Sequence, residues 1–146
     1  MAAPGPVYLD TSALIKLYLP EPGSDELDRA LSDRRDLLVS DLAITEFASA
    51  IGRKRRSGVL APDRASQLYQ TLLDQATAAG YYLRIGTTVD AHRLAERYLL
   101  SLDSVELRAS DALHLALASR EKARTIATFD RRQREAAARL SLVLLP

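Results

Sequence analysis

The sequence has no cysteine and only two histidines, His92 and His114. Without cysteine there is no disulfide framework, no thiolate zinc site and no cysteine nucleophile, and the chain suits a reducing cytoplasm. Neither histidine falls in an expected loop, which argues against a nuclease that uses a histidine pair. The chemistry must therefore come from other side chains.

The sequence also lacks a long apolar run and an excess of either charge. No stretch approaches the roughly 18 apolar residues of a membrane span, and Met1–Gly5 has no basic flank followed by an apolar core, so we expect a cytoplasmic protein. Twenty basic residues oppose 19 acidic ones, for a net charge of +1. That balance argues against a DNA-coating protein, so any nucleic-acid contact must use local patches.

Short apolar runs alternate with helical patterns along the chain. A length of 146 residues suits a single domain, expected over residues 1–146. The alternation predicts an α/β fold, a three-layer α/β/α sandwich with a central parallel sheet of four to five strands. The expected strands are 7–9, 37–39, 81–85, 125–129 and 142–145; the expected helices are 13–19, 24–31, 42–56, 62–80, 89–100 and 107–122, with another after Asp130.

Two aspartates stand where expected strands end. Asp10 directly follows the first strand and Asp130 follows the fourth, so both are expected at the carboxyl edge of the sheet, where open α/β sheets bind ligands. Each also precedes an expected helix, and aspartate is among the best N-cap residues. For either residue alone, helix capping is the simpler interpretation.

Two further acids lie on apolar helix faces. Glu46 has only small or apolar neighbours three and four residues away, so it is expected to face inward, where an unpaired charge is costly. A salt bridge to an arginine would also satisfy it. Asp111 is the only acid in the stretch Ala109–Ser119, and a first-turn position favoured by the helix dipole would explain it. These separate explanations do not account for the four acids together.

A cluster of carboxylates without histidine or cysteine partners suits Mg²⁺ or Mn²⁺, which prefer oxygen ligands, rather than zinc. One or two such ions activate water in phosphodiester hydrolysis. The hydroxyls of Thr11, Ser12 and Thr128 are available to orient water or phosphate, although each is also an ordinary cap or strand residue.

Four motifs follow one another along the chain: YLDTSALIKLY, ITEFASAI, LRASDALHLALA and TFDRRQREAA, before a last apolar strand. Their order, spacing and wording resemble PIN-domain ribonucleases, particularly the toxins of VapBC-type toxin–antitoxin pairs. DTSA alone would be weak evidence, whereas four ordered motifs that span essentially the whole chain are specific.

The resemblance implies a PIN-like fold and a Mg²⁺-dependent endoribonuclease, with Mn²⁺ as a substitute ion. It implies that water attacks the RNA phosphorus and leaves a 5′-phosphate and a 3′-hydroxyl. A cognate antitoxin that covers the groove is also implied, with a homodimer or a toxin–antitoxin hetero-oligomer. The residues that match the family's metal-binding acids are Asp10, Glu46, Asp111 and Asp130, and Thr128 matches its small hydroxyl residue.

Other functions fit less well. A haloacid-dehalogenase-like phosphatase would need an aspartate where Ser12 stands, and a response-regulator receiver would need one after Ile85, where Gly86 stands. The non-enzymatic alternative is a PIN-like module that binds RNA or protein without cutting. Loss of a site acid would be its signature, and none is lost here.

The densest basic groups have different expected roles. Arg131, Arg132 and Arg134 stand beside Asp130, where an RNA backbone or a partner would pass. The run Arg53–Arg56 is expected to be a solvated helix C-terminus that the helix dipole favours.

Three residues near the third motif are expected to be structural. His114 has apolar neighbours and is expected to be a satisfied core histidine. Asp103 and Glu106 fall in an expected loop, where charged residues are ordinary, and are expected to be solvated.

Overall fold

The computed structural model describes residues 2–77 and 80–146. At its centre is a sheet of five parallel strands in the order β3-β2-β1-β4-β5, which confirms the predicted α/β fold. The strands are β1 (Val7–Leu9), β2 (Leu37–Ser40), β3 (Leu83–Ile85), β4 (Thr125–Ala127) and β5 (Val143–Leu145).

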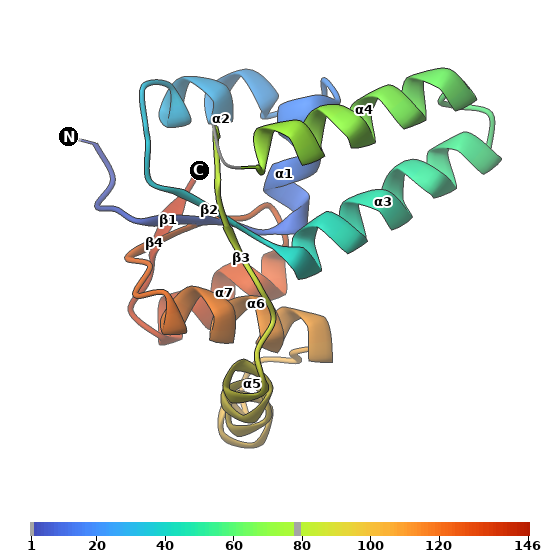
Figure 1. Ribbon diagram of the computed structural model, residues 1–146. Coiled ribbons are helices and arrows are strands. Elements are labelled where there is room, and N and C mark those ends of the chain that lie inside the picture. Colours follow the sequence, from blue (N-terminus) through green and yellow to red (C-terminus); the bar gives the residue numbers. More distant parts are fainter. Residues whose placement is uncertain (1, 78–79) are drawn as a thin grey trace.

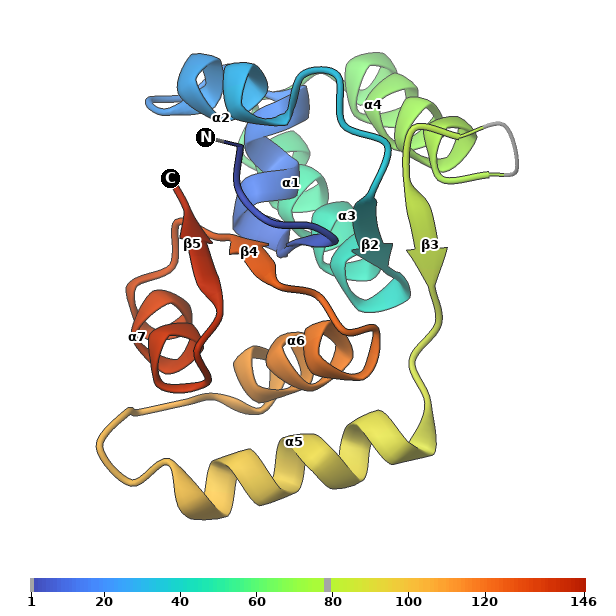
Figure 2. The ribbon, with the colours of Figure 1, turned by 90° about the vertical axis from the view of Figure 1, so that its left-hand side faces the viewer.

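Within these two ranges, seven helices cover the sheet in two layers (Figure 1, Figure 2). On one side, called the α1–α4 face, lie α1 (Thr11–Tyr18), α2 (Ser24–Leu31), α3 (Asp41–Arg56) and α4 (Pro62–Gln75). On the other, the α5–α7 face, lie α5 (Val89–Ser101), α6 (Ala109–Arg120) and α7 (Arg131–Arg139). In the part of the chain so described, no helix has the length and apolar character that a bilayer span requires.

Side chains of the central strand alternate between the two faces, because successive residues of a strand point in opposite directions. Val7 and Leu9 pack into the α1–α4 face, and Tyr8 between them packs into the α5–α7 face. All three are fully buried. Both layers therefore meet on β1, whose carboxyl end is Leu9, directly before Asp10.

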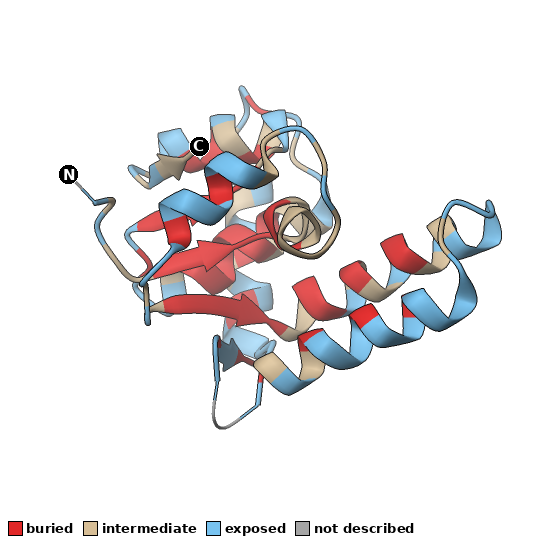
Figure 3. Ribbon diagram, turned by 90° about the horizontal axis from the view of Figure 1, so that it is seen from above, coloured by how far each residue is buried: buried red, intermediate tan, exposed pale blue. Residues whose placement is uncertain are grey.

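Helices α3 and α4 run beside each other and project past the edge of the sheet (Figure 1). Along α4 the buried positions Ala65, Leu68 and Leu72 recur at helical spacing, and Figure 3 shows exposed positions between them. Strands β1 and β2, by contrast, are buried throughout. The projecting pair is thus amphipathic, and its apolar stripes face inward.

The helix expected over residues 62–80 is shorter than predicted. It ends at Gln75, whose carbonyl oxygen accepts hydrogen bonds from the backbone amides of Tyr81 (3.1 Å) and Tyr82 (3.2 Å). The returning chain therefore satisfies the last carbonyls and closes the helix. Positions 78–79 of the expected helix lie outside the described residues.

Two strands are each two residues shorter than expected, and β5 is one residue shorter. The amides of Tyr81 and Tyr82 are used at the end of α4, so β3 begins only at Leu83. In the fourth strand, the Phe129 amide donates to Ser12 Oγ (2.9 Å) and leaves the strand ladder, so β4 ends at Ala127. Asp130 therefore follows β4 after two intervening residues, not directly as predicted.

Candidate active site

Asp10 lies at the carboxyl end of the central strand, with 4% of its surface exposed. Its Oδ1 accepts hydrogen bonds from the Ser12 hydroxyl (2.6 Å) and the Ala13 amide (3.0 Å), so it caps α1, as the simpler interpretation predicted. Burial raises the pKa of the Asp10 carboxyl, and His114, Ser12 and Thr128 oppose that shift. An ionised Asp10 is therefore incompletely compensated by the protein itself.

Glu46 lies in the middle of α3 and is half-buried. Its Oε1 accepts hydrogen bonds from Thr11 Oγ1 (2.8 Å) and His114 Nε2 (2.5 Å). The hydrogen bond from His114 is the main reason that the pKa of Glu46 lies below its usual range; burial acts against it. The partner of this inward-facing acid is thus a histidine, where the sequence suggested an arginine.

Asp111 and Asp130 stand at the starts of α6 and α7. Asp111 Oδ2 accepts a hydrogen bond from the Arg108 amide (3.0 Å), and Asp130 Oδ1 accepts one from the Gln133 amide (3.0 Å). Both acids therefore stabilise helix starts, as the alternative interpretation predicted. Asp111 precedes His114 by three residues, so the two share a side of α6.

Two hydroxyls connect the first strand end to the fourth. Ser12 Oγ donates a hydrogen bond to Asp10 and accepts one from the Phe129 amide. The same atom lies 3.5 Å from Thr128 Oγ1. Thr128 is fully buried, and its Oγ1 accepts the Asp130 amide (3.1 Å). Asp10, Ser12, Thr128 and the Asp130 backbone thus form a continuous hydrogen-bonded connection. Thr11, next to Asp10 in the chain, donates separately to Glu46.

The acids share an edge of the sheet but do not converge on one point. Throughout the described ranges, no group of three or more aspartate, glutamate or histidine side chains is arranged to hold a metal ion. Within the same ranges, however, Glu46, Asp111 and Asp130 each accept hydrogen bonds through only one oxygen of the carboxylate. The second oxygen remains for another ligand, and oxygen donors without thiols suit a hard divalent cation.

Basic residues line two clefts that include residues of this edge. One of about 730 Å³ contains Asp130 with Arg108, Arg131 and Arg132. The other, about 370 Å³, contains Ser12 and Phe129 with Lys16, Arg53 and Lys54. A third cleft of about 580 Å³, near Tyr18 and Tyr82, includes none of the four acids.

Some basic residues differ from expectation. Arg53 and Lys54 come from the run that was expected only to favour a helix end, but they line the cleft beside Ser12. Arg134, expected to contact RNA or a partner, donates instead to the carbonyls of Thr128 (2.9 Å) and Pro146 (2.6 Å). It ties the chain end to the start of α7.

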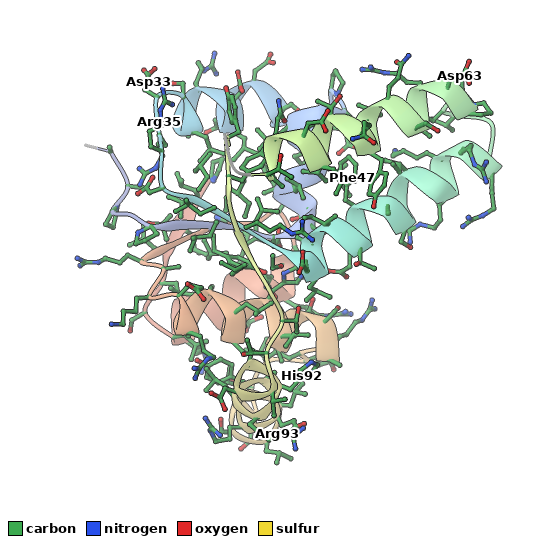
Figure 4. The ribbon with its side chains drawn as sticks, in the orientation of Figure 1. Asp33, Arg35, Phe47, Asp63, His92 and Arg93 are labelled. Carbon is green, nitrogen blue, oxygen red and sulfur yellow. The ribbon has the colours of Figure 1, made fainter. Side chains whose placement is uncertain are left out.

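The two histidines differ in position. His114 is buried and hydrogen-bonded, as predicted, but its partner is Glu46, which the sequence did not reveal. His92 is exposed on α5, below the sheet in Figure 4. Asp103 and Glu106 are exposed, as expected, and Glu106 borders the cleft of Asp130.

A glycine packs against Phe129, an aromatic residue that lines the smaller cleft. Gly23 precedes α2 with φ of 94°, a left-handed conformation that glycine adopts readily. A Cβ atom at this position would lie 2.9 Å from Cε1 of Phe129. The Phe129 ring also has Lys16 Nζ at 4.7 Å from its centroid. The backbone of residue 23 therefore packs directly against this aromatic ring.

The parallel sheet with acidic residues at its carboxyl edge makes the chain an α/β protein whose candidate site lies where open α/β sheets bind ligands. It matches the PIN domain family over residues 7–139. Ribonuclease VapC46 of Mycobacterium tuberculosis is 33% identical over 144 residues, 95% of each chain, and Ribonuclease VapC3 of Pyrobaculum aerophilum is 30% identical over 88% of this chain and 92% of that one. The chain therefore belongs to the PIN domain family, among the VapC-like ribonucleases.

Solved structures share the fold at lower identity. FitAcB from Neisseria gonorrhoeae superposes with a TM-score of 0.73 at 16% identity over 97% of both chains. VapC20 of Mycobacterium tuberculosis, described as a toxin that cleaves the sarcin-ricin loop, has a TM-score of 0.70 at 18% identity over 90% of this chain and 95% of that one.

Proposed function

We propose that this protein is the toxin of a VapBC-type pair, a Mg²⁺-dependent endoribonuclease that acts in the cytoplasm and accepts Mn²⁺ as a substitute. The observation that carries the proposal is the hydrogen-bonded connection at the carboxyl edge of the sheet. It joins Asp10, Ser12 and Thr128 to the backbone amide of Asp130, and Thr11, next to Asp10 in the chain, donates separately to Glu46. Residues from distant parts of the chain thus act on one edge.

The residues that would hold the cation are Asp10, Glu46, Asp111 and Asp130. Burial raises the pKa of Asp10, and a cation beside it would favour the ionised form. When bound, the ion would activate water and offset negative charge on the phosphodiester.

The chain's own residues orient these acids. Thr11 and His114 hold Glu46 by one oxygen, and Ser12 with the Ala13 amide holds Asp10 by one oxygen. Thr128 accepts the Asp130 amide and so fixes the backbone at the start of α7. Oriented acids keep the reacting groups in position before the substrate arrives.

RNA would follow the two basic clefts. Arg131 and Arg132 would contact phosphates on the Asp130 side, and Arg53 and Lys54 would contact them on the Ser12 side. The cleft beside Ser12 contains three basic residues and Glu21, whereas the cleft of Asp130 contains three basic and three acidic residues.

The expected partner is a cognate antitoxin. The solved relatives include VapBC2 from Rickettsia felis bound to a promoter DNA fragment, at a TM-score of 0.67. Co-purification with the product of a neighbouring reading frame, followed by mass measurement of the complex, would test the partner and distinguish a homodimer from a hetero-oligomer.

The decisive experiment is cleavage of total and structured RNAs in Mg²⁺ or Mn²⁺, with EDTA as the metal-free control. Asp10→Asn keeps the size and capping ability of Asp10 but removes its charge. Because substitution near a metal site commonly costs about 10–100-fold, a ligand should cost more than about 100-fold in cleavage rate. Asp63→Asn, at the exposed far end of α4 (Figure 4), is the matched control and should cleave normally.

The outcomes separate the candidate functions. Metal-dependent cleavage with 5′-phosphate products that Asp10→Asn abolishes would support the proposal. RNA binding without cleavage in any metal would favour the catalytically silent binding module. Equal cleavage in EDTA, or by Asp10→Asn, would refute the carboxylate mechanism.

A further inference from the structure

A series of buried hydrogen bonds, the polar chain, runs from Ser40 through Tyr8 and His114 to Glu46. The Tyr8 hydroxyl, in the centre of β1, lies 2.8 Å from Ser40 Oγ and 2.7 Å from His114 Nδ1. The other ring nitrogen of His114, Nε2, lies 2.5 Å from Glu46 Oε1. Tyr8 and Ser40 are fully buried and His114 is 4% exposed, so protein atoms alone enclose the chain's inner part.

The hydrogen bonds of this chain can all point toward Glu46. An ionised carboxylate only accepts, so His114 Nε2 must donate to it. In the neutral imidazole, Nδ1 then accepts the proton of the Tyr8 hydroxyl, and Tyr8 in turn accepts from Ser40. Ser40 Oγ also accepts the Ala43 amide (3.1 Å) at the start of α3. The polar chain therefore begins at the Ala43 amide and ends at Glu46, and both residues belong to α3.

Packing alone does not explain these polar groups. The buried neighbours of Tyr8 on this face include Leu38, Leu115 and Ile126, all apolar. Apolar side chains of the same shape in place of a buried hydrogen-bonded pair are often nearly neutral for stability. What the polar chain adds is direction, because its last donor reaches a single atom.

That atom is Oε1, and Thr11 donates to the same oxygen. Within the ranges that the structure covers, no hydrogen bond reaches Oε2. Two donors on one oxygen restrict rotation of the carboxylate and keep the second oxygen available at the carboxyl edge.

We propose that Tyr8 and His114 are positioning residues that hold Glu46 Oε1 so that Oε2 can bind the divalent cation. Neither residue contacts RNA or the cation. The inference rests on the proposed metal-dependent function, and it assigns to the buried face of the sheet a role in cation affinity.

The test compares two tyrosines of the same face. Tyr8→Phe removes the hydroxyl that supports His114, whereas Tyr98→Phe removes one that donates to Ser119 Oγ (2.9 Å), between α5 and α6. Mn²⁺ is titrated into each metal-free protein by calorimetry. We expect Tyr8→Phe to weaken Mn²⁺ binding about tenfold, as residues that orient metal ligands commonly do, and Tyr98→Phe to bind normally.

Substitutions of His114 provide a second measurement. His114→Gln retains an N–H donor near Glu46 and should restore most of the affinity that His114→Leu loses. In cleavage assays, the Mn²⁺ concentration for half-maximal rate should rise in Tyr8→Phe, while the rate at saturating Mn²⁺ recovers. Circular dichroism would confirm that each variant is folded.

Glu46→Gln separates this inference from the proposed function. If Glu46→Gln loses Mn²⁺ affinity but Tyr8→Phe and His114→Leu bind as the unchanged protein does, the positioning role is wrong and the metal site stands. If Glu46→Gln itself binds Mn²⁺ normally, the positioning role and the assignment of Glu46 as a ligand both fail.

Discussion

The two faces of the sheet both carry a buried apolar cluster but differ in chemistry. The α1–α4 face is filled by large apolar side chains, among them Leu14, Leu27, Phe47 and Leu72, each fully buried. The α5–α7 face buries leucine and isoleucine side chains together with alanines of α6 and α7, and it encloses the polar contact of Tyr8 with His114. Both layers contain apolar packing, and the buried contact of Tyr8 with His114 connects the α5–α7 face to Glu46 at the acidic edge.

The largest expected effect on stability lies in the apolar layer. Leu72→Ala removes a fully buried side chain from α4 and should lower the free energy of unfolding by about 2–5 kcal/mol. Denaturant unfolding would measure the loss. Mn²⁺ affinity of the folded variant should not change, and a parallel loss of affinity would contradict the division of roles between the faces.

A smaller effect is expected at a helix start that belongs to both systems. Ser40 caps α3 through the Ala43 amide (3.1 Å) and also contacts Tyr8, whereas Thr88 caps α5 through the Ala91 amide (3.2 Å). Ser40→Ala and Thr88→Ala should each cost about 0.5–2 kcal/mol of stability. Only Ser40→Ala should also weaken Mn²⁺ binding; equal affinities would show that the polar chain ends at Tyr8.

The smallest effect is expected from acidification of the metal-free protein, because two carboxyls oppose each other. The lowered pKa of Glu46 contributes stability above its unfolded pKa, and this stability is lost as pH falls through the folded value. The raised pKa of Asp10 acts oppositely: its ionisation destabilises the fold as pH rises through the folded value.

Asp10→Asn should expose the contribution of Glu46. Thermal unfolding in chelator from about pH 7 to about pH 3 should show a steeper loss for Asp10→Asn than for the unchanged protein. At neutral pH the variant should be the more stable of the two without metal, and added Mg²⁺ should stabilise only the unchanged protein. Asp63→Asn should follow the unchanged protein; if it behaves like Asp10→Asn, the effect is not specific to the buried acid.

Most of the fold was predictable from local pattern. Apolar runs separated by helical spacing predicted the parallel sheet, because hydrophobic periodicity is a local property. Element ends were less predictable, since they depend on distant hydrogen bonds. The end of α4 at Gln75 depends on amides of Tyr81 and Tyr82, and the end of β4 depends on Ser12.

The candidate acids could be selected from the sequence because their motifs are local and ordered. Their supporting partners could not. Tyr8 meets Ser40 across 32 positions and His114 across 106, and no local pattern links the three. Glu46 illustrates the limit, because its inward orientation was predicted whereas its histidine partner came only from the fold.

Because Gly23 packs against Phe129, a substitution at residue 23 can disturb the candidate site although residue 23 is not part of it. Alanine at position 23 would combine a left-handed backbone with a Cβ atom 2.9 Å from the aromatic ring. The backbone amide of that aromatic residue donates to Ser12, which in turn donates to Asp10. A survey of inactive variants should therefore include substitutions in the turn before α2, although none of the four acids lies in that turn.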